Sequence, residues 1–120
     1  MGTALRSALQ DDEDWAFRLL MQGRDHLRIV LTQHPELSIG WIAAPLPSGR
    51  IEWDTLTAGV AGHEFTCAGL EPPPWTQREP LPLAWTFPSV LLTPHEVRAA
   101  TPDWLACLNI FLPARALVTA

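Results

Sequence analysis

Twelve prolines divide this chain of 120 residues and decide where helices can form. Proline fixes φ and has no backbone N–H, so a helix accepts it only in the first turn. The two longest helices are therefore expected before residue 35 and between residues 48 and 71. Six prolines fall within residues 72–88, which predicts an extended, non-sheet strap laid over the helices and pinned by its aromatic side chains.

The first helix is predicted to begin at a cap on Asp11 or Asp12 and to end near Gln33, after a short helix at residues 3–9. Its apolar residues recur at spacings of three and four, as expected of one buried stripe. They are Ala16, Leu20, Leu27, Val30 and Leu31.

The second helix is predicted from about Ser48 or Gly49 to Ala68. Gly69 suits the left-handed position that closes a helix, and Leu70 would supply the usual apolar contact there. The segment between the two helices is expected to be irregular, with Trp41 and Ile42 as its anchor into the core.

Two short helices are predicted near the C-terminus, because Thr93-Pro94-His95-Glu96 and Thr101-Pro102-Asp103 both match helix start signals. Asn109 can end the second of these in the left-handed conformation. Residues 39–43 and 110–112 could add a small sheet of two or three strands. The expected fold is therefore mainly α: two longer packed helices, short helices and the proline strap, in one domain over residues 1–120.

Composition excludes several function classes. All eight basic residues are Arg, and the net charge is −5, so direct binding of nucleic acid is not expected. The absence of Lys removes Schiff-base chemistry and the phosphate-loop cation. Neither a nucleophile elbow nor a glycine-rich phosphate loop is present. We expect no cofactor, no membrane span and a cytoplasmic protein with Cys67 and Cys107 as reduced thiols.

Residues 63–67 hold the strongest candidate for a polar site. His63, Glu64 and Cys67 lie within little more than one turn of the second helix, close to its apolar stripe. One hypothesis is a small metal-dependent enzyme that uses these three side chains. The favoured interpretation is structural, with Glu64 paired to Arg24 or Arg28 of the first helix, because a carboxylate on an apolar face needs a partner.

Two further sets of residues are candidates for binding a partner. The start of the first helix carries Asp11, Asp12 and Asp14. Their carboxylates either stabilise the helix through its dipole or contact a basic partner. Trp75 and Trp85 belong to the strap, and Trp is a side chain that dominates protein interfaces. Most of the six tryptophans are nevertheless expected to pack in the core.

Four segments of this chain resemble a family of small, mostly actinobacterial, largely uncharacterised proteins and C-terminal domains. The segments are Asp12 to Arg28, Trp53-Asp54-Thr55-Leu56-Thr57-Ala58-Gly59, Pro73-Pro74-Trp75-Thr76 and Asn109 to Leu117. Members of this kind are fused to helix-turn-helix regions, or resemble the antitoxin of a toxin–antitoxin pair whose toxin resembles a nucleotidyltransferase. This sequence carries no added DNA-binding region, which weakens a direct regulatory role.

The leading hypothesis is therefore a non-enzymatic protein-binding module, an antitoxin-like partner that neutralises a basic, nucleotidyltransferase-like enzyme. The alternatives are the metal-dependent enzyme built on His63, Glu64 and Cys67, and an accessory, transcription-linked domain. The sequence leaves the oligomeric state open.

Overall fold

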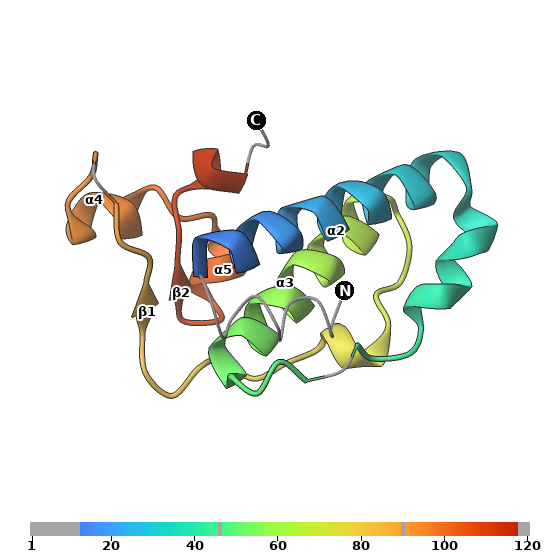
Figure 1. Ribbon diagram of the computed structural model, residues 1–120, viewed down its shortest axis with the longest axis horizontal. Helices are drawn as coiled ribbons and strands as arrows, with labels where there is room; N and C mark the ends of the chain where they lie inside the picture. The colour runs from blue at the N-terminus through green and yellow to red at the C-terminus, as the bar shows by residue number, and fades with distance from the viewer. Residues whose placement is uncertain (1–12, 46, 90, 118–120) are drawn as a thin grey trace. The chain divides into compact units, whose positions relative to one another are not determined.

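The computed structural model describes residues 13–45, 47–89 and 91–117, and this part of the chain is mainly α (Figure 1). The predicted fold class is confirmed: two long helices are accompanied by short helices and a small sheet. The chain divides into two compact units, Met1–Arg78 and Glu79–Ala120. The single domain over residues 1–120 stays a prediction. No helix of the described ranges is long and apolar enough to cross a bilayer.

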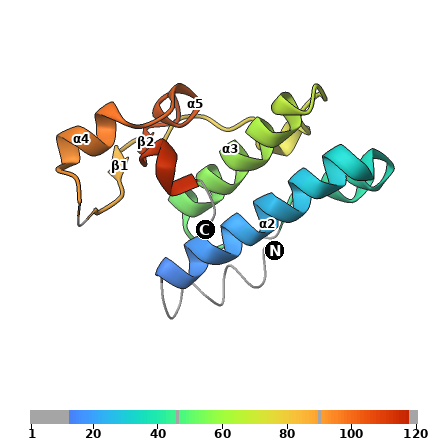
Figure 2. The same cartoon turned by 90° about the horizontal axis from the view of Figure 1, so that it is seen from above.

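The first unit is built on two helices, α2 (Glu13–Gln33) and α3 (Ile51–Cys67), which lie side by side (Figures 1 and 2). The predicted end at Gln33 is confirmed, and so is the buried stripe of α2. The members of that stripe are Ala16, Leu20, Leu27, Val30 and Leu31. The predicted cap at Asp11 or Asp12 and the short helix at residues 3–9 lie outside the described residues.

Helix α3 begins later than predicted. Gly49 has φ +92°, a left-handed conformation that cannot belong to the helix, and Arg50 is the residue that caps it. Ser48 remains outside the helix, where its backbone N–H donates to Asp54 Oδ1 at 2.9 Å. The carboxylate of the first helical turn therefore fixes the approach to the helix in place of a Ser48 cap.

The predicted end of α3 is confirmed by its hydrogen bonds. Gly69 has φ +76°, its N–H donates to Thr66 O, and the N–H of Leu70 donates to Phe65 O. These two bonds form a Schellman motif, which satisfies carbonyls that the helix itself leaves open. The side chain of Leu70 is 38% exposed.

The segments that join and follow the long helices form short 3-10 helices in the first unit. They are η1 (Pro35–Trp41) and η2 (Pro74–Thr76). The half-buried Trp41 and Trp75 pack against a buried cluster of residues from α2 and α3, namely Leu27, Leu31, Ala61 and Phe65. The prediction is thus right for Trp41 and wrong for Ile42, which is 58% exposed.

Residues 39–43 form no strand, contrary to the small-sheet prediction. The backbone N–H of Ile42 donates to Ile39 O at 3.2 Å, which closes the last turn of η1. Pro35 starts this turn with a fixed φ, so local hydrogen bonds replace those that a strand would form with a neighbour.

The second unit contains the sheet, which is made of β1 (Trp85–Thr86) and β2 (Ile110–Phe111). The strands are parallel, with Trp85 opposite Ile110 and Thr86 opposite Phe111. The strand at Ile110 was predicted. The strap was expected to contain no strand, and that prediction is wrong at β1. The reason is that no proline falls within residues 83–87, so the N–H groups of Trp85 and Phe87 can donate to Asn109 O and Phe111 O.

Two short helices complete the second unit. Helix α4 (Pro94–Ala99) begins at the predicted capping box, with Thr93 Oγ1 accepting from the Glu96 N–H and Glu96 accepting from the Thr93 N–H. The left-handed Asn109 is confirmed at φ 64°. A final 3-10 turn, η3 (Ala114–Leu117), follows Pro113.

Helix α5 (Asp103–Ala106) differs from its prediction, because Pro102 caps it and no side chain takes part. The Thr101 hydroxyl is used elsewhere: it donates to Val97 O at 2.8 Å and accepts from the Leu112 N–H at 2.9 Å. Thr101 therefore joins the end of α4 to the residue after β2.

The close approach of η2 to α3 gives a test of the packing in the first unit. An added Cβ at Gly62 would lie 3.2 Å from Thr76 Cβ, and buried Thr76 is held by its own 2.6 Å hydrogen bond to Pro73 O. Gly→Ala within a helix ordinarily adds about 1 kcal/mol of stability. We expect Gly62→Ala instead to lower the free energy of unfolding by about 1 kcal/mol, because overpacking costs about 1–3 kcal/mol.

Urea denaturation of the two proteins measures this difference. Gly40→Ala is the matched control, because nothing lies within 4 Å of its added Cβ, and it should leave stability unchanged or slightly raised. A Gly62→Ala variant as stable as the native protein would show that η2 shifts without cost to accommodate the added methyl group on α3.

Candidate functional site

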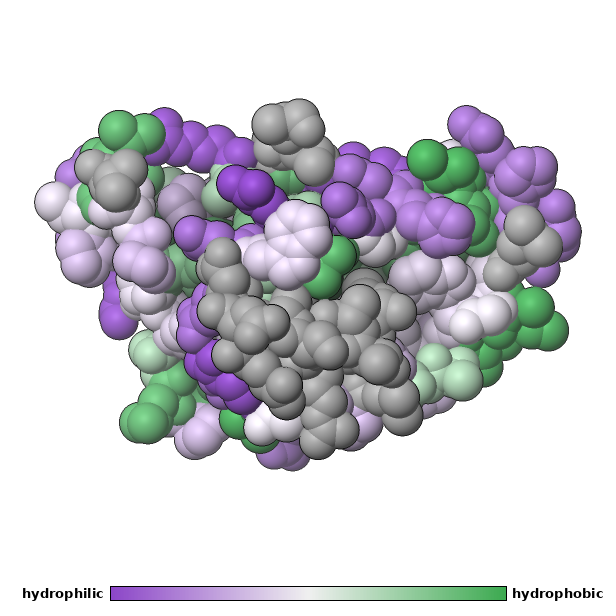
Figure 3. Space-filling view, in the orientation of Figure 1, coloured by the Kyte–Doolittle hydropathy of each residue, from purple (hydrophilic) through white to green (hydrophobic). Residues whose placement is uncertain are grey.

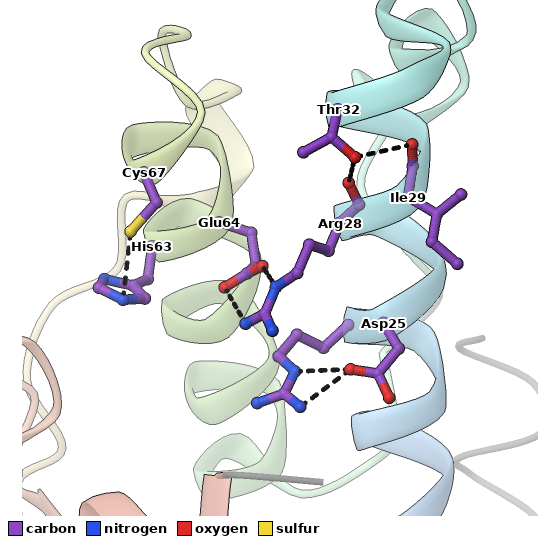
Figure 4. A network of polar contacts seen from close by, with 8 residues as sticks. Asp25, Arg28, Ile29, Thr32, His63, Glu64 and Cys67 are labelled. Atoms are coloured by element: carbon purple, nitrogen blue, oxygen red, sulfur yellow. Dashed lines mark hydrogen bonds and ion pairs between the residues drawn. The ribbon is translucent and has the colours of Figure 1, made fainter.

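The polar centre of the first unit is an ion pair between its two long helices. Arg28 of α2 reaches Glu64 of α3 through two bonds, Nε to Oε1 at 2.6 Å and Nη2 to Oε2 at 3.1 Å (Figure 4). The structural interpretation of Glu64 predicted an arginine partner from α2, and this is confirmed for Arg28. Arg24, the other candidate, is buried and bonds to Asp25 Oδ1 at 2.9 Å.

The environments of the two partners differ. The side chain of Glu64 is only 6% exposed, whereas that of Arg28 is 53% exposed. The hydrogen bonds that Arg28 donates to Glu64 are the main cause that raises the pKa of Arg28, so the guanidinium stays charged. Both carboxylate oxygens accept from the planar guanidinium of Arg28. The pair therefore constrains the rotation of α3 against α2 and also compensates the charge of Glu64.

His63 and Cys67 form a second pair on α3, one turn apart. Cys67 Sγ lies 3.4 Å from His63 Nε2, and Figure 4 shows both side chains pointing away from the Arg28–Glu64 pair. Burial is the main cause that lowers the pKa of His63, with a smaller lowering by Arg28 and an opposing effect of Glu64. The imidazole is therefore neutral at physiological pH.

The structure does not bring His63, Glu64 and Cys67 to one point. Both oxygens of Glu64 are engaged by Arg28, while His63 and Cys67 contact each other. Within the described ranges, no group of three or more His, Cys, Asp or Glu side chains is arranged to hold a metal ion. This arrangement offers nothing specific to the metal-dependent hypothesis.

The two strap tryptophans have structural contacts. Trp75 packs on the core cluster, and its indole N–H donates to Trp41 O at 2.7 Å. Trp85 lies in β1 with its ring centroid 4.5 Å from that of Phe87. Both are partly buried, so only part of each indole is left for a partner.

Of the acidic candidates, Asp14 is described and is exposed in the first turn of α2, whereas Asp11 and Asp12 lie outside the described residues. The neighbouring Glu13 is ion-paired: Arg50 donates to Glu13 at 2.7 Å and to Glu52 at 2.6 Å. This network ties the first turn of α2 to the first turn of α3.

Two exposed apolar side chains near the starts of α2 and α3 were not predicted from the sequence. Trp15 is 48% exposed and Ile51 is 58% exposed, and they stand beside Glu13 and Arg50 along the chain. We call Trp15, Ile51, Glu13, Arg50 and Glu52 the helix-start surface. Its signal was the Trp that directly follows the acidic run, off the stripe of α2.

Further exposed apolar side chains in the first unit lie on η1, where hydrophobic residues are visible at the surface in Figure 3. They include Ile39, which is 72% exposed, and the neighbouring Ile42 directly after η1. These residues follow Pro35 in a turn that is closed by a local hydrogen bond. Trp41 is the residue of this segment that packs against the core cluster.

Comparisons with known proteins give no match: no family model, no curated protein and no solved structure is similar to this chain. The resemblance to antitoxin-like proteins therefore stays a prediction.

The unequal exposure of Arg28 and Glu64 predicts unequal costs of removing each. Arg28→Met leaves a buried carboxylate without its counter-charge, and we expect a loss of about 2 kcal/mol, between the values for surface and buried pairs. Glu64→Met leaves a half-exposed guanidinium that water can solvate, so its cost should be clearly smaller.

Chemical denaturation of both single variants and the double variant gives these costs and the coupling energy. Arg18→Met is the control, since this arginine is exposed on the same helix. Equal losses from Arg28→Met and Arg18→Met would mean that the ion pair contributes nothing to the first unit.

The lowered pKa of His63 predicts a pH dependence of stability. The folded state disfavours the imidazolium, so the unfolded state binds the proton more readily. The contribution of neutral His63 is complete above the ordinary histidine pKa and is lost as the pH falls below it. The free energy of unfolding should fall more between pH 7.5 and 5 for the native chain than for His63→Gln, and identical slopes would contradict this.

Proposed function

We propose that this chain is a non-catalytic protein-binding module that neutralises a basic, nucleotidyltransferase-like enzyme, in the manner of an antitoxin. The observation that carries the proposal is the half-exposed Trp15 at the acidic start of α2. A large indole at the surface beside carboxylates is the combination that favours binding to a basic protein.

The charges of the helix-start surface support this choice of partner. Arg50 is shared between Glu13 and Glu52, so these three residues leave one net negative charge, and Asp14 adds another carboxylate. An enzyme that handles nucleotides presents positive charge around its phosphate-binding cleft. Attraction between the two surfaces would speed association and set the orientation of docking.

The ion pairs also support a rigid binding surface. Trp15 and Ile51 stand on two helices that pack against each other and are joined at their starts by the Arg50–Glu13 ion pair. A surface that is ordered before binding loses little conformational entropy when its partner arrives. The apolar side chains would enter the partner's cleft, and the carboxylates would meet its basic rim.

No contact among the described residues favours the two alternatives, a metal-dependent enzyme and an accessory, transcription-linked domain. The carboxylate that the enzyme would need is occupied by Arg28. Net negative charge disfavours contact with a phosphate backbone. The inhibitory function is therefore the proposal to test first.

The test uses a nucleotidyltransferase-like enzyme, sought first among the products of the neighbouring genes. Nucleotide transfer by that enzyme is measured with increasing amounts of the purified native chain and of Trp15→Ala. We expect inhibition by the native chain and an inhibition constant about tenfold higher for Trp15→Ala, as for an interface hot spot. The thermal midpoint should change little, because half of the side chain is already exposed.

Leu83→Ala is the matched control, since Leu83 is 80% exposed in the second unit and lies outside the helix-start surface. It should inhibit like the native chain. A native chain that changes the activity of no neighbouring enzyme would refute the proposal. If Trp15→Ala inhibits as strongly as the native chain, the inhibitory function stands, but binding through the helix-start surface is refuted.

A further inference from the structure

The two cysteines of this chain are both exposed, yet their sulfur atoms have different polar neighbours. Cys67, the last residue of α3, has Sγ 3.4 Å from His63 Nε2 (Figure 4). Cys107, after α5, donates from Sγ to the backbone carbonyl of Trp104 at 3.3 Å. The chain thus holds a thiol beside a base and a thiol beside an amide oxygen.

This difference matters because the thiolate is the reactive form of cysteine. A backbone carbonyl can accept a hydrogen bond from the Cys107 thiol but cannot remove its proton. The neutral imidazole of His63, 3.4 Å from the sulfur, can do so. Cys67 therefore has a nucleophile-and-base arrangement that Cys107 lacks.

We propose that Cys67 is a site of reversible covalent modification by low-molecular-weight disulfides, with His63 as the base. His63 Nε2 takes the proton from Cys67 Sγ, and the thiolate attacks one sulfur of the disulfide. The old S–S bond breaks as the new one forms, and the departing thiolate takes the proton from His63. Cys67 is oxidised and the departing sulfur is reduced, so the exchange needs no other reactant.

The test compares two single-thiol variants, Cys107→Ser and Cys67→Ser, each incubated with oxidised glutathione at pH 7.5. Intact-protein mass spectrometry follows the gain of one glutathionyl group, and dithiothreitol should reverse it. We expect Cys67 to react about tenfold faster than Cys107, as for a thiol with an adjacent base. In denaturing urea both thiols should react at the same rate. Equal rates in the folded proteins would overturn the proposal.

His63→Gln in the Cys107→Ser variant separates the base from general exposure. Glutamine can hydrogen-bond to the thiol but cannot take its proton. We expect the rate at Cys67 to fall several-fold, to near that of Cys107. Loosening of the helix end would instead speed the reaction, so a slower rate identifies His63 as the base. An unchanged or faster rate would remove His63 from the step.

Discussion

The buried carboxylate of Glu64 is the constraint around which the first unit is arranged. It lies 6% exposed on α3 between Ala61 and Phe65 of the core cluster, where an uncompensated charge would be costly. Two hydrogen bonds from Arg28 supply the compensation and constrain how α3 is rotated against α2.

Once α2 and α3 are set in this way, the rest of the first unit follows from their shared surface. Trp41 and Trp75 cover the core cluster, and the indole of Trp75 bonds to the backbone of Trp41, which joins the two 3-10 segments. The same rotation leaves His63 and Cys67 on a different side of α3 from Glu64 (Figure 4). Helix α3 thus carries the structural carboxylate of Glu64 on one side and the His63–Cys67 pair on another.

Much of this architecture could be predicted from the sequence where local rules decide the conformation. Gly69 and Asn109 adopted the left-handed conformation, and Thr93 capped α4, because each depends on neighbours within a few residues. The ion pair was also predictable in kind, since a carboxylate near an apolar stripe requires a partner. The choice of Arg28 over Arg24 depends on the rotation of α2, which no local pattern contains.

Two of the errors share a physical cause: a side chain or backbone group formed a hydrogen bond over a longer distance than the pattern assumed. Thr101 gave its hydroxyl to Val97 and Leu112 in place of capping α5. The backbone of Trp85 found a strand partner at Asn109 and Ile110, far along the chain. For the candidate surface, the exposed Trp15 was not predicted, whereas the predicted Trp75 and Trp85 have contacts within their own units.

The second unit has helices of six and four residues and strands of two, too short to be stable on apolar contacts alone. Single polar atoms therefore reinforce its buried side chains, such as Val97, Leu105 and Ile110: they are the Thr101 hydroxyl, the Thr93 hydroxyl and the Asn109 amide, which donates to Leu81 O at 3.0 Å. Valine in place of either threonine nearly keeps the shape of the side chain but removes the hydroxyl, which at Thr93 caps α4 and at Thr101 joins the end of α4 to the residue after β2.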